Sequence, residues 1–252
     1  MKIQVLGCAG TVSREAKTSA FLINDSVLMD SGTICSSLSP SELAKIGTIF
    51  ISHPHFDHVK GLPSLAETLI FMEGSSPVTI NASETAIDAI RRHIMNDVIW
   101  PDFSRLPTQE NPVLRYRSIR EGEPVRVGGV TVTPYCLLDN QTDFGYLVEN
   151  GSTSLLYTSD IGVGARLCIN GRVAESVIVE VSFPDEKRDL ATLTGHLTPA
   201  LLMELLSPLP AQPRTVFVTH MKTYYREEII RQLQELPLNN LVILNDGDIL
   251  QL

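Results

Sequence analysis

A short apolar run that leads directly into a cluster of histidine and aspartate side chains constrains this chain more than any other feature. Residues 46–51 read IGTIFI, a pattern typical of a buried strand. Shortly after this run, four of six consecutive positions are occupied by His53, His55, Asp57 and His58. The cluster therefore lies on a loop at the carboxyl end of a strand, where a ligand can approach.

The chemistry of these four side chains indicates a metal centre. Imidazole nitrogen and carboxylate oxygen suit Zn²⁺, Mn²⁺ and Fe ions. His53 and His55 are two positions apart, so both can point to the same side of an extended backbone. Asp57 and His58 come one turn later and can face a second ion. A single histidine would be explained as a surface or core residue, but four ligand-type side chains this close together favour metal binding.

The composition is that of a globular protein. Of the 252 residues, 43% are hydrophobic and 19% charged, and no apolar run approaches the ~20 residues that span a bilayer. A formal charge of −9 argues against a nucleic-acid partner, because a polyanion needs a basic surface. The chain enters a strand-like pattern at once, so we expect a cytoplasmic protein, or a periplasmic one if a signal peptide has been removed.

Hydrophobic periodicity predicts an α+β chain. The expected strands cover residues 2–7, 19–24, 27–30, 46–51, 78–81, 130–136, 144–149, 154–158, 177–181, 215–218, 241–244 and 249–252. The expected helices lie near residues 41–45, 61–72 and 83–95, from residue 198 onward, and over 226–236, with an irregular loop over 96–112. This order predicts two mixed β-sheets flanked by helices, an αββα sandwich. No linker divides it, so we expect a single domain over residues 1–252.

The pattern His53-x-His55-x-Asp57-His58 resembles the HxHxDH signature of the metallo-β-lactamase fold superfamily. The resemblance implies the αββα sandwich and two divalent metal ions, with Zn²⁺ favoured and Mn²⁺ or Fe as alternatives. Because this superfamily includes hydrolases of β-lactams, thioesters, lactones, RNA and cyclic nucleotides, the motif does not select a substrate.

The resemblance implies two further ligands at later strand ends. Asp160 follows the apolar run 154–158 and would bridge both ions. A turn residue before Gly162 is the alternative interpretation of Asp160. His220 follows the run 215–218 in the same way and would complete the ligand set of the second ion. The chain has only six histidines, so one at this strand end favours the ligand role.

One ligand that the family normally supplies is missing. A third histidine for the first ion is expected after residues 130–136, but the chain has none there. Counting back without gaps from Phe144 places Asp139 at the ligand position, whereas a one-residue gap places Asn140 there. Aspartate would favour harder ions such as Mn²⁺. Asparagine would be a weak ligand and would leave the first site labile.

Segments outside the ligands resemble class II cyclic-nucleotide phosphodiesterases. They cover residues 92–101, 179–184 and 195–199, and the resemblance extends over nearly the whole chain. It implies metal-dependent hydrolysis of cyclic AMP or cyclic GMP to the 5′-monophosphate. The implied partner is this small-molecule substrate, without a nucleic acid or a membrane, and a homodimer is compatible with it.

Three residues are expected to carry the chemistry under this resemblance. His196 lies at the amino end of the helix that starts at Pro199, where it could contact phosphate or protonate the leaving 3′-oxygen. Glu180 could orient His196, and a structural capping pair is the alternative interpretation. Asp57 would orient the attacking water together with Asp160.

Other functions remain open at this point. A tRNA 3′-processing nuclease shares HxHxDH and the Gly-His-x-Thr segment, but a pI of about 5.1 and the lack of a basic arm oppose it. A thioesterase or lactonase lacks the pattern of residues 195–199. A metal- or nucleotide-binding homologue with weakened catalysis is the alternative from another class. His93 is interpreted as structural, and Trp100 either walls a nucleobase or fills the core.

Overall fold

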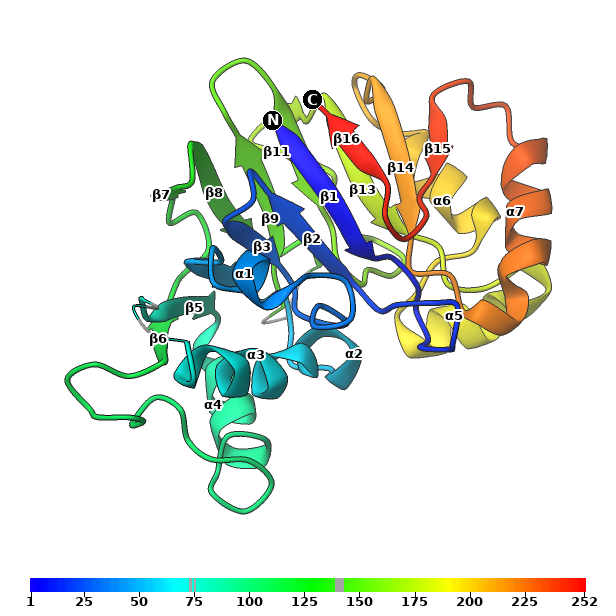
Figure 1. The fold of residues 1–252 in the computed structure, drawn as a ribbon. Helices are drawn as coiled ribbons and strands as arrows, with labels where there is room; N and C mark the ends of the chain where they lie inside the picture. Colours follow the sequence, from blue (N-terminus) through cyan, green and yellow to red (C-terminus); the bar gives the residue numbers. More distant parts are fainter. Residues whose placement is uncertain (73, 75, 139–142) are drawn as a thin grey trace.

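The computed structural model describes residues 1–72, 74, 76–138 and 143–252. Within these residues, two seven-stranded sheets face each other and helices cover the outer side of each sheet (Figure 1). The terminal strands, β1 (Lys2–Gly7) and β16 (Ile249–Gln251), pair antiparallel, so the two ends of the chain lie side by side. The expected αββα sandwich of two mixed sheets is confirmed.

The first sheet changes from antiparallel to parallel pairing across its width. Its order is β16-β1-β2-β3-β4-β5-β6, in which the further strands are β2 Ala20–Ile23, β3 Val27–Met29, β4 Thr48–Phe50, β5 Val78–Ala82 and β6 Leu114–Ser118. The strands from β3 to β6 pair in parallel. The helices of this half are α1 Pro40–Leu43, α2 Phe56–Val59, α3 Gly61–Ile70 and α4 Glu84–His93. The parallel strands therefore end at one common edge.

The second sheet has the order β15-β14-β13-β10-β9-β8-β7. Its strands are β7 Val125–Val127, β8 Val130–Tyr135, β9 Gly145–Glu149, β10 Ser154–Tyr157, β13 Ser176–Glu180, β14 Thr215–Thr219 and β15 Leu241–Ile243. β10, β13, β14 and β15 pair in parallel. The helices of this half are α5 Arg188–Thr194, α6 Pro199–Leu206 and α7 Arg226–Glu235. A small ladder joins β11 Cys168–Ile169 to β12 Arg172–Val173.

Alternation along the strands builds the three apolar layers. In β2, Phe21 and Ile23 enter the core between the sheets, whereas Ala20 and Leu22 pack under the helices of the first half. β13 does the same, with Ile178 between the sheets and its neighbours under α6. Central strands are thus buried on both faces, which explains why they appear in the sequence as continuous apolar runs.

Helices begin where polar caps precede apolar periodicity. Ser39 and Ser83 accept a hydrogen bond from the backbone N–H three residues later, and so satisfy a free donor of the first turn. Thr198 caps α6 in the same way, with Pro199 at the first helical position. The helix start expected at Thr198 is therefore confirmed.

Elements with few buried side chains were not expected from the sequence. β6 buries only Leu114 of its five residues, and α5 buries only Ala191 of seven. Apolar periodicity is absent in such segments, so they resemble loops. In the described ranges, none of the helices has the length and hydropathy needed to cross a bilayer. The single domain over residues 1–252 stays a prediction.

Candidate metal centre

The side chains singled out in the sequence converge at the edge where parallel strands of both sheets end. His53 follows β4, and α2 begins a few residues later. Asp160 follows β10, and His220 follows β14. Ligand atoms from these elements lie within 4.8 Å of one another in three overlapping groups: His53–His58–Asp160, Asp57–His58–His220 and Asp160–His196–His220. The centre is therefore assembled from both sheets.

One part of the centre is formed by Asp57, His58, Asp160 and His220. The Nε2 atoms of His58 and His220 are 3.3 Å apart. Asp57 Oδ2 lies 3.2 Å from His220 Nε2. Asp160 Oδ1 lies 3.4 Å from Nε2 of His58 and 3.3 Å from Nε2 of His220. Two imidazole nitrogens and two carboxylates thus point at one small volume.

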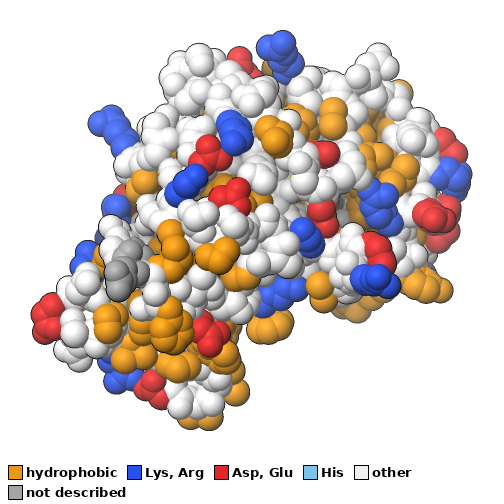
Figure 2. All heavy atoms as spheres, viewed as in Figure 1, with side chains coloured by type: hydrophobic (Ala, Val, Ile, Leu, Met, Phe, Trp, Pro, Cys, Tyr) orange, Lys and Arg blue, Asp and Glu red, His pale blue; other side chains and the backbone are white. Residues whose placement is uncertain are grey.

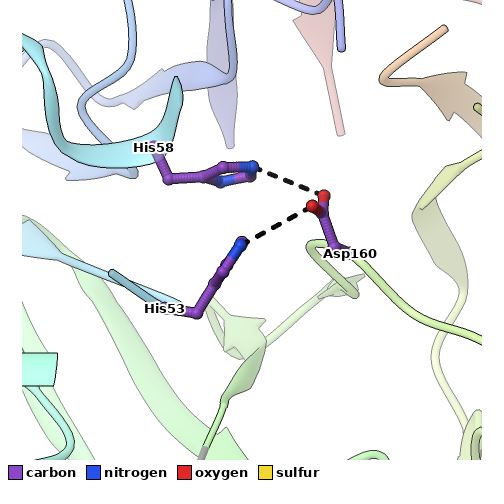
Figure 3. A group of neighbouring side chains, drawn as sticks. All are labelled: His53, His58 and Asp160. Carbon is purple, nitrogen blue, oxygen red and sulfur yellow. Dashed lines mark ion pairs between the residues drawn. The ribbon is translucent and has the colours of Figure 1, made fainter. Parts of the chain in front are cut away.

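A second part of the centre lies on the other oxygen of Asp160. Figure 3 shows His53 and His58 with their rings directed at this carboxylate from two sides. His53 Nε2 is 3.6 Å from Asp160 Oδ2. The ring of His55 lies next to that of His53, with 4.5 Å between centroids, and His55 is exposed. Asp160 therefore faces both halves of the centre, as a bridging carboxylate would.

A buried carboxylate lies behind the candidate ligands and orients the ring of His58. Asp30 is fully buried and accepts hydrogen bonds from Ser52 N–H at 2.8 Å and from Tyr157 Oη at 2.6 Å. His58 Nδ1 lies 2.7 Å from Asp30 Oδ2. Because a carboxylate only accepts, Nδ1 of His58 carries a proton, and Nε2 is the nitrogen left to bind an ion. Sequence reasoning missed Asp30; its place directly after β3 was the available signal.

Serine hydroxyls support the other two rings. Ser52 Oγ bonds Asp30 and lies 3.0 Å from His53 Nδ1. Ser182 Oγ lies 3.1 Å from His220 Nδ1, and donates to Glu180 at 2.8 Å. Both serines are fully buried. Their contacts hold each ring by its Nδ1 atom, which leaves Nε2 for a ligand.

Strained and tightly packed backbone surrounds the centre. Asp30, Ser159 and His220 adopt left-handed conformations, with φ of 53°, 57° and 62°. Non-glycine residues rarely take this conformation, and it concentrates at functional sites. Gly32 approaches the metal loop so closely that a Cβ atom would lie 2.2 Å from the backbone oxygen of Asp57. Only glycine fits at Gly32 without displacing the loop.

Burial and neighbouring charges shift the pKa values of several side chains in the centre. Burial, aided by the charge of His58, lowers the pKa of His53 to about 3, so its imidazole is neutral at neutral pH. Burial opposes ionisation of Asp57, but the hydrogen bond with His220 and the charge of His58 outweigh it and hold the pKa of Asp57 below its usual range. Burial also opposes protonation of His58, yet the negative Asp160 and Asp30 raise its pKa. A cation bound at the centre would offset the negative charges of Asp30, Asp57 and Asp160.

His196 and Glu180 form a dyad at the margin of the centre. α5 ends at Gly195, whose φ of 71° turns the chain back toward the sheet. Glu180 is fully buried, and its Oε1 lies 2.9 Å from His196 Nδ1 and accepts the N–H of Leu197 at 3.1 Å. Burial opposes protonation of His196, but Glu180 outweighs it and raises the pKa of the imidazole. The ring of His196 stacks on that of His220, with centroids 5.6 Å apart.

Residues 31–221 match the family model of the beta-lactamase superfamily domain. The chain belongs to this superfamily. Among curated relatives, a probable 3′,5′-cyclic-nucleotide phosphodiesterase of Yersinia pestis is 27% identical over 75% of this chain. That match spans 63% of the Yersinia protein, so the chain covers less than two thirds of it. A ribonuclease Z of Haloarcula marismortui is 22% identical over 98% of this chain and 95% of its own length.

A solved structure shares the superfamily fold over its full length. Unliganded yeast PDE1 aligns with a TM-score of 0.79 and 19% identity, covering 100% of this chain and 99% of that one. At this identity the likeness establishes the fold. The metallo-β-lactamase fold and the family resemblance expected from the sequence are both confirmed.

The donor set fits the divalent metal ions that the superfamily fold implies. His53 Nε2 and Asp160 Oδ1 are buried without a hydrogen-bond partner among the described residues. Asp160 Oδ1 lies 3.4 Å from Nε2 of His58 and 3.3 Å from Nε2 of His220, the ring nitrogens that face the centre. Buried polar atoms without partners are costly, and a shared cation would satisfy them.

The candidates for the third ligand and the tryptophan singled out in the sequence have different outcomes. Asp139 and Asn140, the candidates for the third ligand, lie outside the described residues. Asp143, which sequence reasoning did not consider, is half-buried, and its charge interacts with His55. Trp100 packs against the apolar layer under the helices of the first half, in agreement with core filling.

Proposed function

We propose that the protein is a metal-dependent hydrolase of 3′,5′-cyclic nucleotides. The observation that carries this proposal is the position of His196, held by the buried Glu180 and with a ring nitrogen within 4.8 Å of ligand atoms of Asp160 and His220. A group able to give up a proton therefore stands beside the residues suited to divalent ions. Similarity to the Yersinia pestis relative supports cyclic nucleotides as the substrate class.

We assign the ligands of the two ions as the sequence predicts. The first ion takes His53, His55 and Asp160, and the second takes Asp57, His58, Asp160 and His220. Two divalent ions bound there would polarise the phosphodiester and bring the pKa of a bound water to about 7 in the case of Zn²⁺. The imidazoles favour Zn²⁺, while the carboxylates also suit Mn²⁺ or Fe²⁺.

The chain's own residues then direct the proton transfers. Asp57 stays ionised and can accept a hydrogen bond from the attacking water, which fixes its direction. The attacking water releases one proton to solvent as its oxygen bonds to phosphorus, and the bond from phosphorus to the 3′-oxygen breaks. His196, bound through Nδ1 to Glu180, donates the proton of Nε2 to that oxygen. The product is the nucleoside 5′-monophosphate.

The charge distribution supports a small substrate. The net charge is −9, and basic and acidic side chains are interspersed over the described residues on the face in Figure 2, where no extended basic area is visible. Long polyanions require such an area. Three expectations stay predictions: the protein has no nucleic-acid partner, it can form a homodimer, and it is located in the cytoplasm or the periplasm.

A tRNA 3′-processing phosphodiesterase is the second candidate. It is favoured by the similarity to the Haloarcula marismortui ribonuclease Z, which extends over 98% of this chain. The same catalytic arrangement could cleave an RNA phosphodiester, so the substrate distinguishes the two. The net charge of −9 is the reason for ranking it second.

A turnover assay with metal-free and reconstituted protein tests the proposal. The substrates are cyclic AMP, cyclic GMP, bis(p-nitrophenyl) phosphate and a precursor tRNA, and products are identified by chromatography. We expect 5′-monophosphates from the cyclic nucleotides only after Zn²⁺ or Mn²⁺ is restored. Cleavage of the tRNA alone would select the second candidate. Failure of the metal-loaded protein on every substrate would leave a binding protein.

A further inference from the structure

Ser182 stands between the segment that carries His196 and the segment that carries His220. It is fully buried and lies two positions after the end of β13. Its backbone N–H donates to the backbone oxygen of Leu197 at 3.0 Å, and its backbone oxygen accepts the N–H of Lys222 at 3.2 Å. Both backbone groups are therefore bonded, which fixes the side chain between the two imidazoles.

The hydroxyl group of Ser182 connects Glu180 to the ring of His220. Ser182 Oγ lies 2.8 Å from Glu180 Oε2 and 3.1 Å from His220 Nδ1. The backbone oxygen of His220, at 3.0 Å, competes for the hydroxyl proton, but a charged acceptor at a shorter distance binds it more strongly. The proton of Ser182 thus goes to Glu180, and Oγ is left to accept the N–H of His220.

His196 does not need this hydroxyl group. Its Nδ1 lies 3.3 Å from Ser182 Oγ but only 2.9 Å from Oε1 of Glu180. Each oxygen of the Glu180 carboxylate therefore has its own direction. Oε1 holds His196 directly, whereas Oε2 reaches His220 through Ser182.

The first half of the sandwich contains the same arrangement on different strands. Asp30 Oδ2 lies 2.7 Å from His58 Nδ1. Ser52, which follows β4, donates to Asp30 Oδ1 at 2.9 Å and lies 3.0 Å from His53 Nδ1. In each half, a buried carboxylate contacts one ring directly and a second ring through a buried serine. This recurrence indicates that the serine is part of how the rings are held.

We propose that Ser182 is a positioning residue through which Glu180 orients His220 toward the second ion. This inference rests on the two-ion centre and the acid of the proposed function. An ion on Nε2 of His220 requires the ring proton on Nδ1, where Ser182 accepts it. Glu180 then has two tasks, one for the acid and one for an ion ligand, and Ser182→Ala interrupts only the second.

Ion affinity tests the assignment without reference to turnover. Stripped protein is titrated with Zn²⁺ in competition with a chromophoric chelator. Ser182→Ala should bind one of the two ions ~10- to 100-fold more weakly, the usual effect of removing the partner of a ligating imidazole. Unchanged affinity for both ions in folded Ser182→Ala protein would overturn the inference.

Ser104→Ala is the matched control for this titration. Ser104 Oγ also donates to a buried carboxylate, that of Asp102, at 2.6 Å, but it lies outside the centre. Ser104→Ala should bind both ions like wild type, and its Tm shows how much a lost donor to a buried carboxylate costs. An equal loss of ion affinity in Ser104→Ala would assign the effect to general destabilisation and overturn the inference.

Proton NMR of zinc-loaded protein gives a readout that a general loss of packing would not produce. In wild type, the Nδ1 proton of His220 should appear at the low field of a hydrogen-bonded ring proton. In Ser182→Ala it should move to higher field, because its acceptor is gone, whereas Ser104→Ala should leave it in place. A signal that stays in place in Ser182→Ala would contradict the assignment.

The choice of leaving group separates the two tasks of Glu180. Ser182→Ala keeps the contact between Glu180 and His196, so its kcat should change to the same degree on cyclic AMP and on bis(p-nitrophenyl) phosphate. A loss confined to cyclic AMP would place Ser182 with the acid and overturn the inference. Wild-type protein that binds two ions but hydrolyses neither substrate would refute the proposed function, while ion affinity and NMR still decide the role of Ser182.

Discussion

The buried carboxylate of Asp30 offers a sharp test of how the centre is organised. In Asp30→Asn, one carboxylate oxygen becomes an NH₂ group. The oxygen that accepts the Ser52 backbone N–H must remain an acceptor, since that donor cannot be reversed. The NH₂ group therefore takes the place of Oδ2, which faces Tyr157 Oη and His58 Nδ1. Tyr157 can rotate its hydroxyl and accept. His58 can accept only if its proton moves to Nε2.

This change of tautomer sets the expected magnitude. A protonated Nε2 can no longer bind an ion, so His58 must lose its new hydrogen bond whenever metal binds. Substitutions behind metal ligands cost ~10- to 100-fold in affinity. At 1.36 kcal/mol per factor of ten, this corresponds to about 1.4–2.7 kcal/mol. We expect Asp30→Asn to weaken the binding of one of the two ions by this amount. The affinity is measured by competition with a chromophoric chelator. Nitrogen NMR of the stripped variant should show His58 protonated at Nε2.

Tyr157→Phe is the control for this prediction. It removes one donor to Asp30 but leaves the carboxylate and its contact with His58 in place. Its metal affinity should fall by less than ~3-fold, because the lost hydrogen bond acts on the ion only through Asp30, and the contact of Asp30 with His58 is kept. Asp30→Asn protein with wild-type affinity and the proton still on Nδ1 would refute the reasoning.

Three further predictions follow from the centre. Asp57→Ala should reduce kcat on cyclic AMP at least ~100-fold, because it removes a ligand and the orienter of water; unchanged kcat in folded protein would show that the site is misplaced. His196→Ala should retain both ions and lose ~10²–10⁴ in kcat on cyclic AMP but much less on bis(p-nitrophenyl) phosphate, whose leaving group needs little protonation; equal losses would exclude the acid role. Gly32→Ala should destabilise the fold by about 1–3 kcal/mol, seen as a lower Tm, whereas Gly47→Ala, with no atom within 4 Å of a new Cβ, should not; similar Tm values would contradict the close packing.

The candidate ligands that follow strands were predictable from the sequence, and the residues that support them were not. His53, Asp160 and His220 each come two positions after the end of an apolar run, so local periodicity places all three near strand ends. Asp30 is different, because its contacts with Ser52 and Tyr157 span 22 and 127 residues. Local patterns carry no information on such pairs. The prediction that His196 and Glu180 act together has the same long-range character, and it came from family resemblance rather than from periodicity.

The position of the centre between the two sheets has a consequence for stability. His53 and His58 belong to the first half of the sandwich, whereas Asp160 and His220 belong to the second. Ions bound by both would cross-link the halves, and a ligand present at 100 times its Kd adds about 2.7 kcal/mol to the free energy of unfolding. The coupling is reciprocal, so a substitution in the layer between the sheets that lets them slide should weaken ion binding. Metal supply would then set the lifetime of the folded chain as well as its chemistry.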